Sequence, residues 1–230
     1  MTTTPASPRL DRSARRPQAG PPLLAPVLAF ALLTISYVVV NRSTPHPDAS
    51  GLEVLTYVQD HGASIKLGAF LLFASGVPLA LTAAVLYRRL RALGITAPGS
   101  AITLVGGVLA ANALALSAMF GWSSGRLSAD AGPALARVLA DLSFLAGGPA
   151  YSVMFALLIA GVSVPGLLAG LLPRAVSWAG LVLAAAGMLS TLALLLDGFA
   201  YLLPVVRFGG LIWLVIAAVL LPRTRRSHHQ

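Results

Sequence analysis

The chain of 230 residues contains no cysteine. Disulfides, thiolate metal sites, covalently attached haem and cysteine nucleophiles are therefore excluded. Charge is also scarce, since only 10% of the residues are Asp, Glu, Lys or Arg, whereas 57% are hydrophobic. A soluble domain of this size needs far more polar residues to cover a water-facing surface. The composition predicts a membrane protein, with the lipid bilayer as its main partner.

Six apolar stretches have the length that a membrane-crossing helix needs, which is about 20 residues for a hydrocarbon core of about 30 Å. They lie at about residues 21–40, 64–87, 100–122, 142–163, 175–196 and 202–221. We predict an all-α membrane protein, a six-transmembrane-helix bundle that forms one domain over residues 21–222. Residues 1–20 are expected to be a disordered basic cytoplasmic tail, and residues 223–230 a second basic cytoplasmic tail.

Basic residues predict the orientation of this bundle. The N-terminal tail, the second and fourth gaps between spans and the C-terminus together hold 11 of the 16 basic residues. Because basic residues collect on the cytoplasmic side of membrane proteins, both termini are predicted to be cytoplasmic. The net charge of +9 is explained by this flanking role, so no nucleic-acid partner is predicted.

The first gap between spans contains a helix signal of its own. Ser50 and Glu53 have the spacing of a capping box, and Leu52, Leu55 and Val58 follow at helical intervals. A short amphipathic helix is therefore predicted on the outer surface between spans one and two. Two roles stay open for it, namely simple packing on the bundle and covering an outward-facing cavity.

Prolines predict bends in two of the spans. Pro78 and Pro149 end similar segments, Phe73–Pro78 and Phe144–Pro149, which are 71 residues apart. A basic residue, Lys66 or Arg137, lies 12 residues before each proline. Duplication of a helical hairpin would explain this match, and so would the frequency of Gly and Pro in membrane helices. Either way, each proline removes a backbone hydrogen bond and can free a carbonyl to face a cavity.

Charged and polar residues near the predicted outer helix ends form the candidate site. Arg137 and Asp141 are four residues apart, so they are expected to share a helix face and to form an ion pair. The candidate vestibule or solute-binding residues are Lys66, Asn112, Arg137, Asp141, Asp197 and Arg207. Two interpretations stay open: a vestibule for an ion or small polar solute, and helix ends that pair only with one another and with water.

No complete catalytic or metal signature is present. Residues 121–125 match the G-x-S-x-G pattern of serine hydrolases around Ser123, with Ser124 beside it and His61 on the same predicted side. A nucleophile elbow follows a strand, however, whereas this segment ends a membrane helix. All histidines lie outside the predicted spans, which disfavours a haem held between helices. We therefore predict no catalytic residues, no cofactor and no metal, and favour a non-enzymatic role.

Three segments of the chain resemble an uncharacterised family of small, largely actinobacterial integral membrane proteins with about six helices. They are LADLSFLAGGPAYSVMFALLIAGV, LLPRAVSWAGLVLAAAGMLSTLALL and PVVRFGGLIWLVIAAVLLPR. The resemblance implies a multi-pass protein of the bacterial cytoplasmic (inner) membrane, and it implies no activity.

Three functions are carried forward from the sequence. The leading hypothesis is a binding or interaction role in the membrane, with a membrane protein or a second copy of the chain as partner. The first alternative is a small-solute or proton-coupled transporter with an outward-facing polar vestibule. The second is a membrane-embedded hydrolase.

Overall fold

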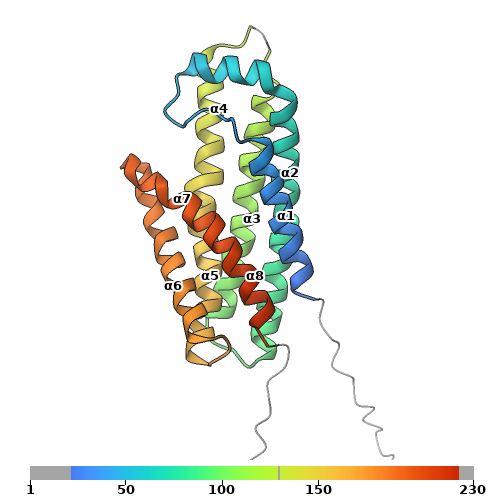
Figure 1. The fold of residues 1–230 in the computed structure, drawn as a ribbon, viewed down its shortest axis with the longest axis vertical. Coiled ribbons are helices and arrows are strands. Elements are labelled where there is room, and N and C mark those ends of the chain that lie inside the picture. The colour runs from blue at the N-terminus through green and yellow to red at the C-terminus, as the bar shows by residue number, and fades with distance from the viewer. Residues whose placement is uncertain (1–21, 129, 223–230) are drawn as a thin grey trace, which may run out of the picture.

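The computed structural model describes residues 22–128 and 130–222, which form an all-helical bundle (Figure 1). The predicted tails, residues 1–20 and 223–230, lie outside the described residues. The α-helices are α1 (Leu24–Val40), α2 (Gly51–Ala92), α3 (Gly99–Ser124), α4 (Pro133–Leu145), α5 (Tyr151–Leu168), α6 (Arg174–Leu189), α7 (Leu202–Pro204) and α8 (Gly210–Leu220). Short π-helical segments, η1 (Ala146–Ala150) and η4 (Val205–Gly209), and 3₁₀ segments, η2 (Ser190–Leu194) and η3 (Asp197–Tyr201), connect some of them.

Five helical stretches of the described chain are long and apolar enough to cross a membrane. They are Gly51–Ala92, Gly99–Ser124, Pro133–Leu168, Arg174–Leu194 and Gly198–Leu220. The remaining apolar helix, α1, has 17 residues. Large apolar side chains face outward, and Leu32, Phe70 and Val182 are each about two-thirds exposed. Such a surface suits lipid rather than water, because it offers no polar cover. The prediction of a helical, multi-pass membrane protein is confirmed at this level.

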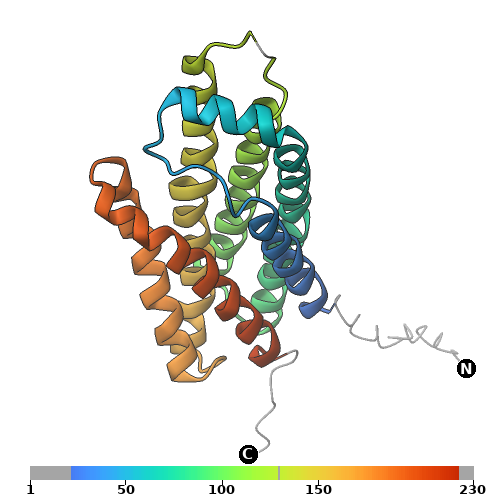
Figure 2. The ribbon, with the colours of Figure 1, turned by 45° about the horizontal axis from the view of Figure 1, so that its top comes forward.

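The centre of the bundle is a pack of α2, α3 and α5, with α1, α6 and α8 around it (Figures 1 and 2). Gly106 brings α3 close to α5, because a Cβ atom at this position would lie 2.5 Å from the backbone nitrogen of Leu158. Side chains that fill the centre, such as Leu86, Phe155 and Leu214, are at most 1% exposed. Small residues at helix contacts are the usual way in which membrane helices pack tightly.

Helix α2 has two parts that meet at His61, where the backbone leaves helical geometry (φ −118°, ψ 18°). We call residues 51–60, the first part, the crossing helix, because it lies across one end of the bundle (Figures 1 and 2). The predicted capping box is confirmed in part, since the backbone N–H of Glu53 donates to the Ser50 hydroxyl at 3.2 Å. The sequence did not predict that this helix would continue directly into a spanning helix.

The face of the crossing helix that packs on the bundle differs slightly from the predicted one. Val54, Leu55 and Val58 are buried, whereas Leu52 is 64% exposed. At about 100° per residue, the first three side chains share one narrow arc, and Leu52 falls outside it. Val54 rather than Leu52 completes the packed face, because Val54, Leu55 and Val58 form a buried cluster with Ala136 of α4.

The bend expected at Pro78 is found instead at His61. Pro78 is buried inside regular helix, and its carbonyl accepts a hydrogen bond from the Thr82 hydroxyl at 2.8 Å. Packing of α2 between α1 and α3 holds the helix straight past the missing N–H. Pro149, by contrast, lies in the π-helical segment η1, where the helix is locally widened.

The described chain begins and ends at the same end of the bundle, the lower end in Figure 1, and the crossing helix marks the upper end. Arg89, near the end of α2, donates to the carbonyl of Leu221 at 3.3 Å and so joins α2 to the end of α8. The α2–α3 and α5–α6 turns also lie at the lower end.

Candidate functional site

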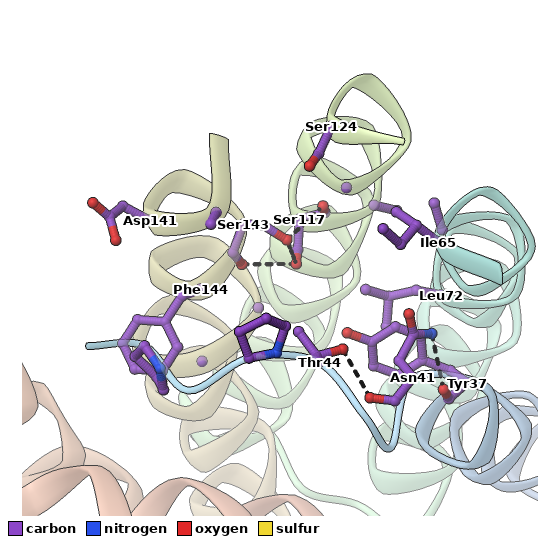
Figure 3. A pocket seen from close by; sticks show the side chains of 18 of the residues that line it. Tyr37, Asn41, Thr44, Ile65, Leu72, Ser117, Ser124, Asp141, Ser143 and Phe144 are labelled. Atoms are coloured by element: carbon purple, nitrogen blue, oxygen red, sulfur yellow. Dashed lines mark hydrogen bonds between the residues drawn. The ribbon is translucent and has the colours of Figure 1, made fainter. Parts of the chain in front are cut away.

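A cavity of about 450 Å³ opens at the upper end of the bundle. The crossing helix and residues 41–47 cover it, and the upper parts of α2, α3 and α4 form its walls together with η1 and η4. Figure 3 shows side chains of α2 and of the α3–α4 pair facing each other across this space. A volume of this size is typical of small-molecule sites.

The cavity wall is mainly apolar. Ile65, Ala69 and Leu72 line it from α2, and Phe144 lines it from α4. The crossing helix adds Val54, Tyr57 and Val58 from above. The crossing helix therefore both packs on the bundle and covers the cavity. That this cavity faces outward stays a prediction.

Arg137 links the wall of the cavity to its cover. Its Nε lies 3.0 Å from an Asp141 carboxylate oxygen, so the predicted ion pair is present. Its Nη1 also donates to the carbonyl of Ala49, immediately before the crossing helix begins. Both side chains of the pair are partly exposed, so the ion pair itself adds little stability. The hydrogen bond from Arg137 to the Ala49 carbonyl is the contact that holds the crossing helix over the cavity.

Arg207 in η4 lies beside η1, the segment that continues α4. Its guanidinium donates to the carbonyl of Gly147 and lies 5.2 Å from the centre of the Tyr151 ring. No carboxylate of the described side chains forms an ion pair with Arg207. A guanidinium held by a carbonyl and an aromatic face keeps its full positive charge, and that charge borders the cavity.

Two serines close the gap between α3 and α4. The Ser117 hydroxyl donates to the Ser143 carbonyl at 2.8 Å, and the Ser143 hydroxyl donates to the Ser117 carbonyl at 3.1 Å (Figure 3). Gly147 permits this approach, because a Cβ atom there would lie 2.5 Å from the Ser117 oxygen. Ser117 thus both lines the cavity and bonds to the neighbouring helix.

The structure brings three of the six predicted site residues to the cavity, namely Arg137, Asp141 and Arg207. Lys66 is exposed, lies beside Gly125 and does not line this cavity. Asn112 is at the middle of α3 with its side chain exposed on the outside of the bundle, so it also does not line the cavity. Asp197 begins η3, and its side chain is outside what the structure describes.

Several lining residues were not singled out from the sequence, among them Tyr37, Tyr57, Ser143, Phe144 and Ser152. A signal for part of this set was present. Most of the lining residues of α4 and η1 recur at helical intervals on one face, namely Arg137, Ala140, Asp141, Phe144, Gly147 and Gly148, whereas Leu139 and Ser143 line the cavity from beside it.

The hydrolase pattern is not assembled into a catalytic pair. The Ser123 hydroxyl donates to the carbonyl of Met119 in its own helix. Ser124 lines the cavity, but within the described residues neither serine bonds to a histidine. His61 bonds to the Tyr57 carbonyl through Nδ1 and stacks on the Tyr57 ring. Within residues 22–128 and 130–222, no three His, Asp or Glu side chains form a group that could hold a metal.

The fold and the cavity define a class, a helical multi-pass membrane protein with a covered cavity at one end. Comparison of the chain with protein-family models, curated proteins and solved structures finds no match.

Proposed function

We propose that this protein is a membrane-embedded binding protein whose ligand enters the upper cavity from outside the cytoplasm. The chain would cross the bacterial cytoplasmic membrane six times, with α1 as the shortest span and both termini inside. The excess of basic residues on the predicted inner side supports this orientation. Arg88, Arg89 and Arg91 are near the end of α2 and Arg174 begins α6, and these two helix ends lie at the lower end of the bundle (Figure 1).

The observation that carries the proposal is that the cavity ends inside the bundle. Lining residues stop at Leu72 in α2 and at Ser117 in α3. Below them, Leu79, Leu114 and Leu158 are at most 1% exposed and belong to one continuous apolar core. A closed floor of this kind supports binding rather than passage, because a solute would have to displace close-packed side chains to continue.

Cysteine accessibility tests this proposal, since the natural chain has no thiol. In intact cells, Ser117→Cys is expected to react slowly with a membrane-impermeant maleimide, because Ser117 lines the cavity but is only 3% exposed. Ser75→Cys is the matched control and is expected to stay unlabelled, since Ser75 is fully buried beneath the floor. A Ser117→Cys protein that folds but is labelled no faster than Ser75→Cys would refute an outward-opening cavity.

The proposed orientation also predicts which exposed residues the same impermeant maleimide labels on intact cells. Ser128→Cys, in an exposed segment at the upper end, is expected to be labelled on intact cells. Thr96→Cys, exposed in the α2–α3 turn at the lower end, is expected to react only after the cells are permeabilised. The reverse pattern would place the cavity on the cytoplasmic side.

Transport is the second candidate function, favoured by the two π-helical segments. Both η1 and η4 supply lining residues, and the bond between Arg207 and Gly147 joins them. Single π-helical turns inside α-helices are often found at functional sites, and transporters use such breaks. Flux of a bound ligand into proteoliposomes would favour transport, and binding without flux would favour the leading proposal.

A further inference from the structure

We propose that the ligand of the upper cavity is an amphiphilic anion, a carboxylate or phosphate group on an apolar body, with Arg207 binding the anionic group. This inference rests on the proposed binding function and names the ligand class of the same cavity.

The charge of the cavity favours an anion. Among the described residues, its charged lining consists of three arginines, Arg42, Arg137 and Arg207, and one aspartate, Asp141, and His46 is the one histidine that lines it. Asp141 is already paired with Arg137, and His46 lies against Asp48. The described lining therefore offers an incoming cation no unpaired carboxylate, whereas it offers an anion Arg207, which forms an ion pair with none of the described carboxylates.

Arg207 has the donors for this role. Guanidinium carries five N–H groups, and one nitrogen of Arg207 is engaged with the Gly147 carbonyl. The buried Tyr151 ring backs the guanidinium and limits its movement. A positioned guanidinium with free N–H groups suits carboxylate and phosphate oxygens, which it can bind through two parallel bonds.

Ser152 supplies a second polar contact on the same cavity. This residue is 1% exposed and lines the cavity, and its hydroxyl makes no hydrogen bond with the described residues. A hydroxyl that borders the cavity and has no partner among the described residues can donate to an oxygen of the ligand.

The rest of the cavity suits an apolar body. Ile65 and Leu72 point into the space from α2, opposite Phe144 of α4 (Figure 3). Val54 and Val58 of the crossing helix close it from above. Burial of hydrocarbon against these side chains contributes about 0.8 kcal/mol per CH₂ group, so a chain of several carbons would bind more tightly than a bare anion.

Two sources could supply this chemistry: a free amphiphilic acid from outside the cell, and an anionic phospholipid of the surrounding membrane. Both present an acidic oxygen group joined to hydrocarbon. The experiment separates them by competition.

The test is titration calorimetry on the full chain in phosphatidylcholine nanodiscs, with empty nanodiscs subtracted. Decyl phosphate is expected to bind saturably, decanol more weakly, and decyltrimethylammonium weakest of all. Arg207→Gln is expected to weaken decyl phosphate binding by about tenfold or more, as loss of a charge-assisted bond implies. Arg207→Lys is expected to lose less, because it keeps the charge.

Arg126→Gln is the matched control. It removes the same charge from an exposed arginine that lies over Trp122 and does not line the cavity, so binding is expected to stay unchanged. Circular dichroism and gel filtration establish that each variant is folded. If Arg207→Gln misfolds, Arg207→Lys and the comparison of the three decyl compounds carry the test.

The outcomes separate the two proposals. Equal binding of decanol and decyl phosphate, unaffected by Arg207→Gln, would overturn the anion while leaving a binding cavity in place. No binding of any decyl compound, together with an unreactive Ser117→Cys, would overturn the binding function itself. If phosphatidylglycerol in the nanodisc competes with decyl phosphate, the ligand is a membrane lipid; without competition, it is a free amphiphile. Both of these last results support the anionic amphiphile.

Discussion

Replacing Gly106 with alanine is expected to lower the thermal midpoint of the detergent-solubilised protein by about 5 °C. The added Cβ atom would lie 2.5 Å from the backbone nitrogen of Leu158 and 2.8 Å from the carbonyl oxygen of Met154. Backbone atoms cannot move aside as a flexible side chain can, so α3 and α5 must separate. Overpacking of this kind costs about 1–3 kcal/mol, and for a chain of this length each kcal/mol shifts the midpoint by about 2–4 °C.

Gly132→Ala is the control for this prediction. Gly132 lies just before α4, and a Cβ atom there would have no heavy atom within 4 Å. Its midpoint is expected to match that of the wild type in a fluorescence or light-scattering melt. Equal midpoints for both variants would mean that α3 and α5 do not pack as described.

Arg137→Gln is expected to open the cover of the cavity. The variant removes the hydrogen bond that ties α4 to the carbonyl of Ala49 and the ion pair to Asp141. A hydrogen bond to a charged group contributes about 1.5–3 kcal/mol, so loss of this bond shifts the balance between closed and open cover by about tenfold or more. Maleimide is therefore expected to label Ser117→Cys about tenfold faster in the Arg137→Gln background.

Asp141→Asn separates the two contacts of Arg137. It breaks the ion pair but leaves the bond from Arg137 to the cover, so the labelling rate of Ser117→Cys is expected to change little. If Asp141→Asn accelerates labelling as much as Arg137→Gln does, the ion pair rather than the Ala49 bond holds the cover closed.

The sequence predicted the helices better than the breaks between them. The helix before span two was predicted from Ser50 and Glu53, because a capping box is local chemistry between residues three apart. The break at His61 was not predicted, and it lies where the chain passes close to a distant segment. Gly62 passes close to Gly125, and a Cβ on Gly62 would lie 3.1 Å from the Gly125 carbonyl oxygen. Such a contact leaves no pattern in the residues around His61.

Site residues were predicted correctly where their contact depends only on their spacing within one helix. They were predicted wrongly where the contact depends on which face of the helix is turned toward the bundle. The ion pair of Arg137 and Asp141 follows from a separation of four residues. Lys66 has the same distance to a proline as Arg137 has, yet it faces outward. Asn112 likewise faces away from the bundle, while the preceding residues Ala110 and Ala111 are buried. Which side of a span faces its neighbours is set by tertiary packing, and spans that are apolar all round carry little sign of it.

The closed floor below Leu72 and Ser117 has a consequence for energetics. A charged molecule held above that floor experiences only the part of the transmembrane voltage that falls between the mouth and the floor. Occupancy would then follow the concentration on the side to which the mouth opens, almost independently of gradients across the bilayer. That dependence is the behaviour of a sensor, whereas a pump must bring its cargo into contact with both aqueous phases in turn.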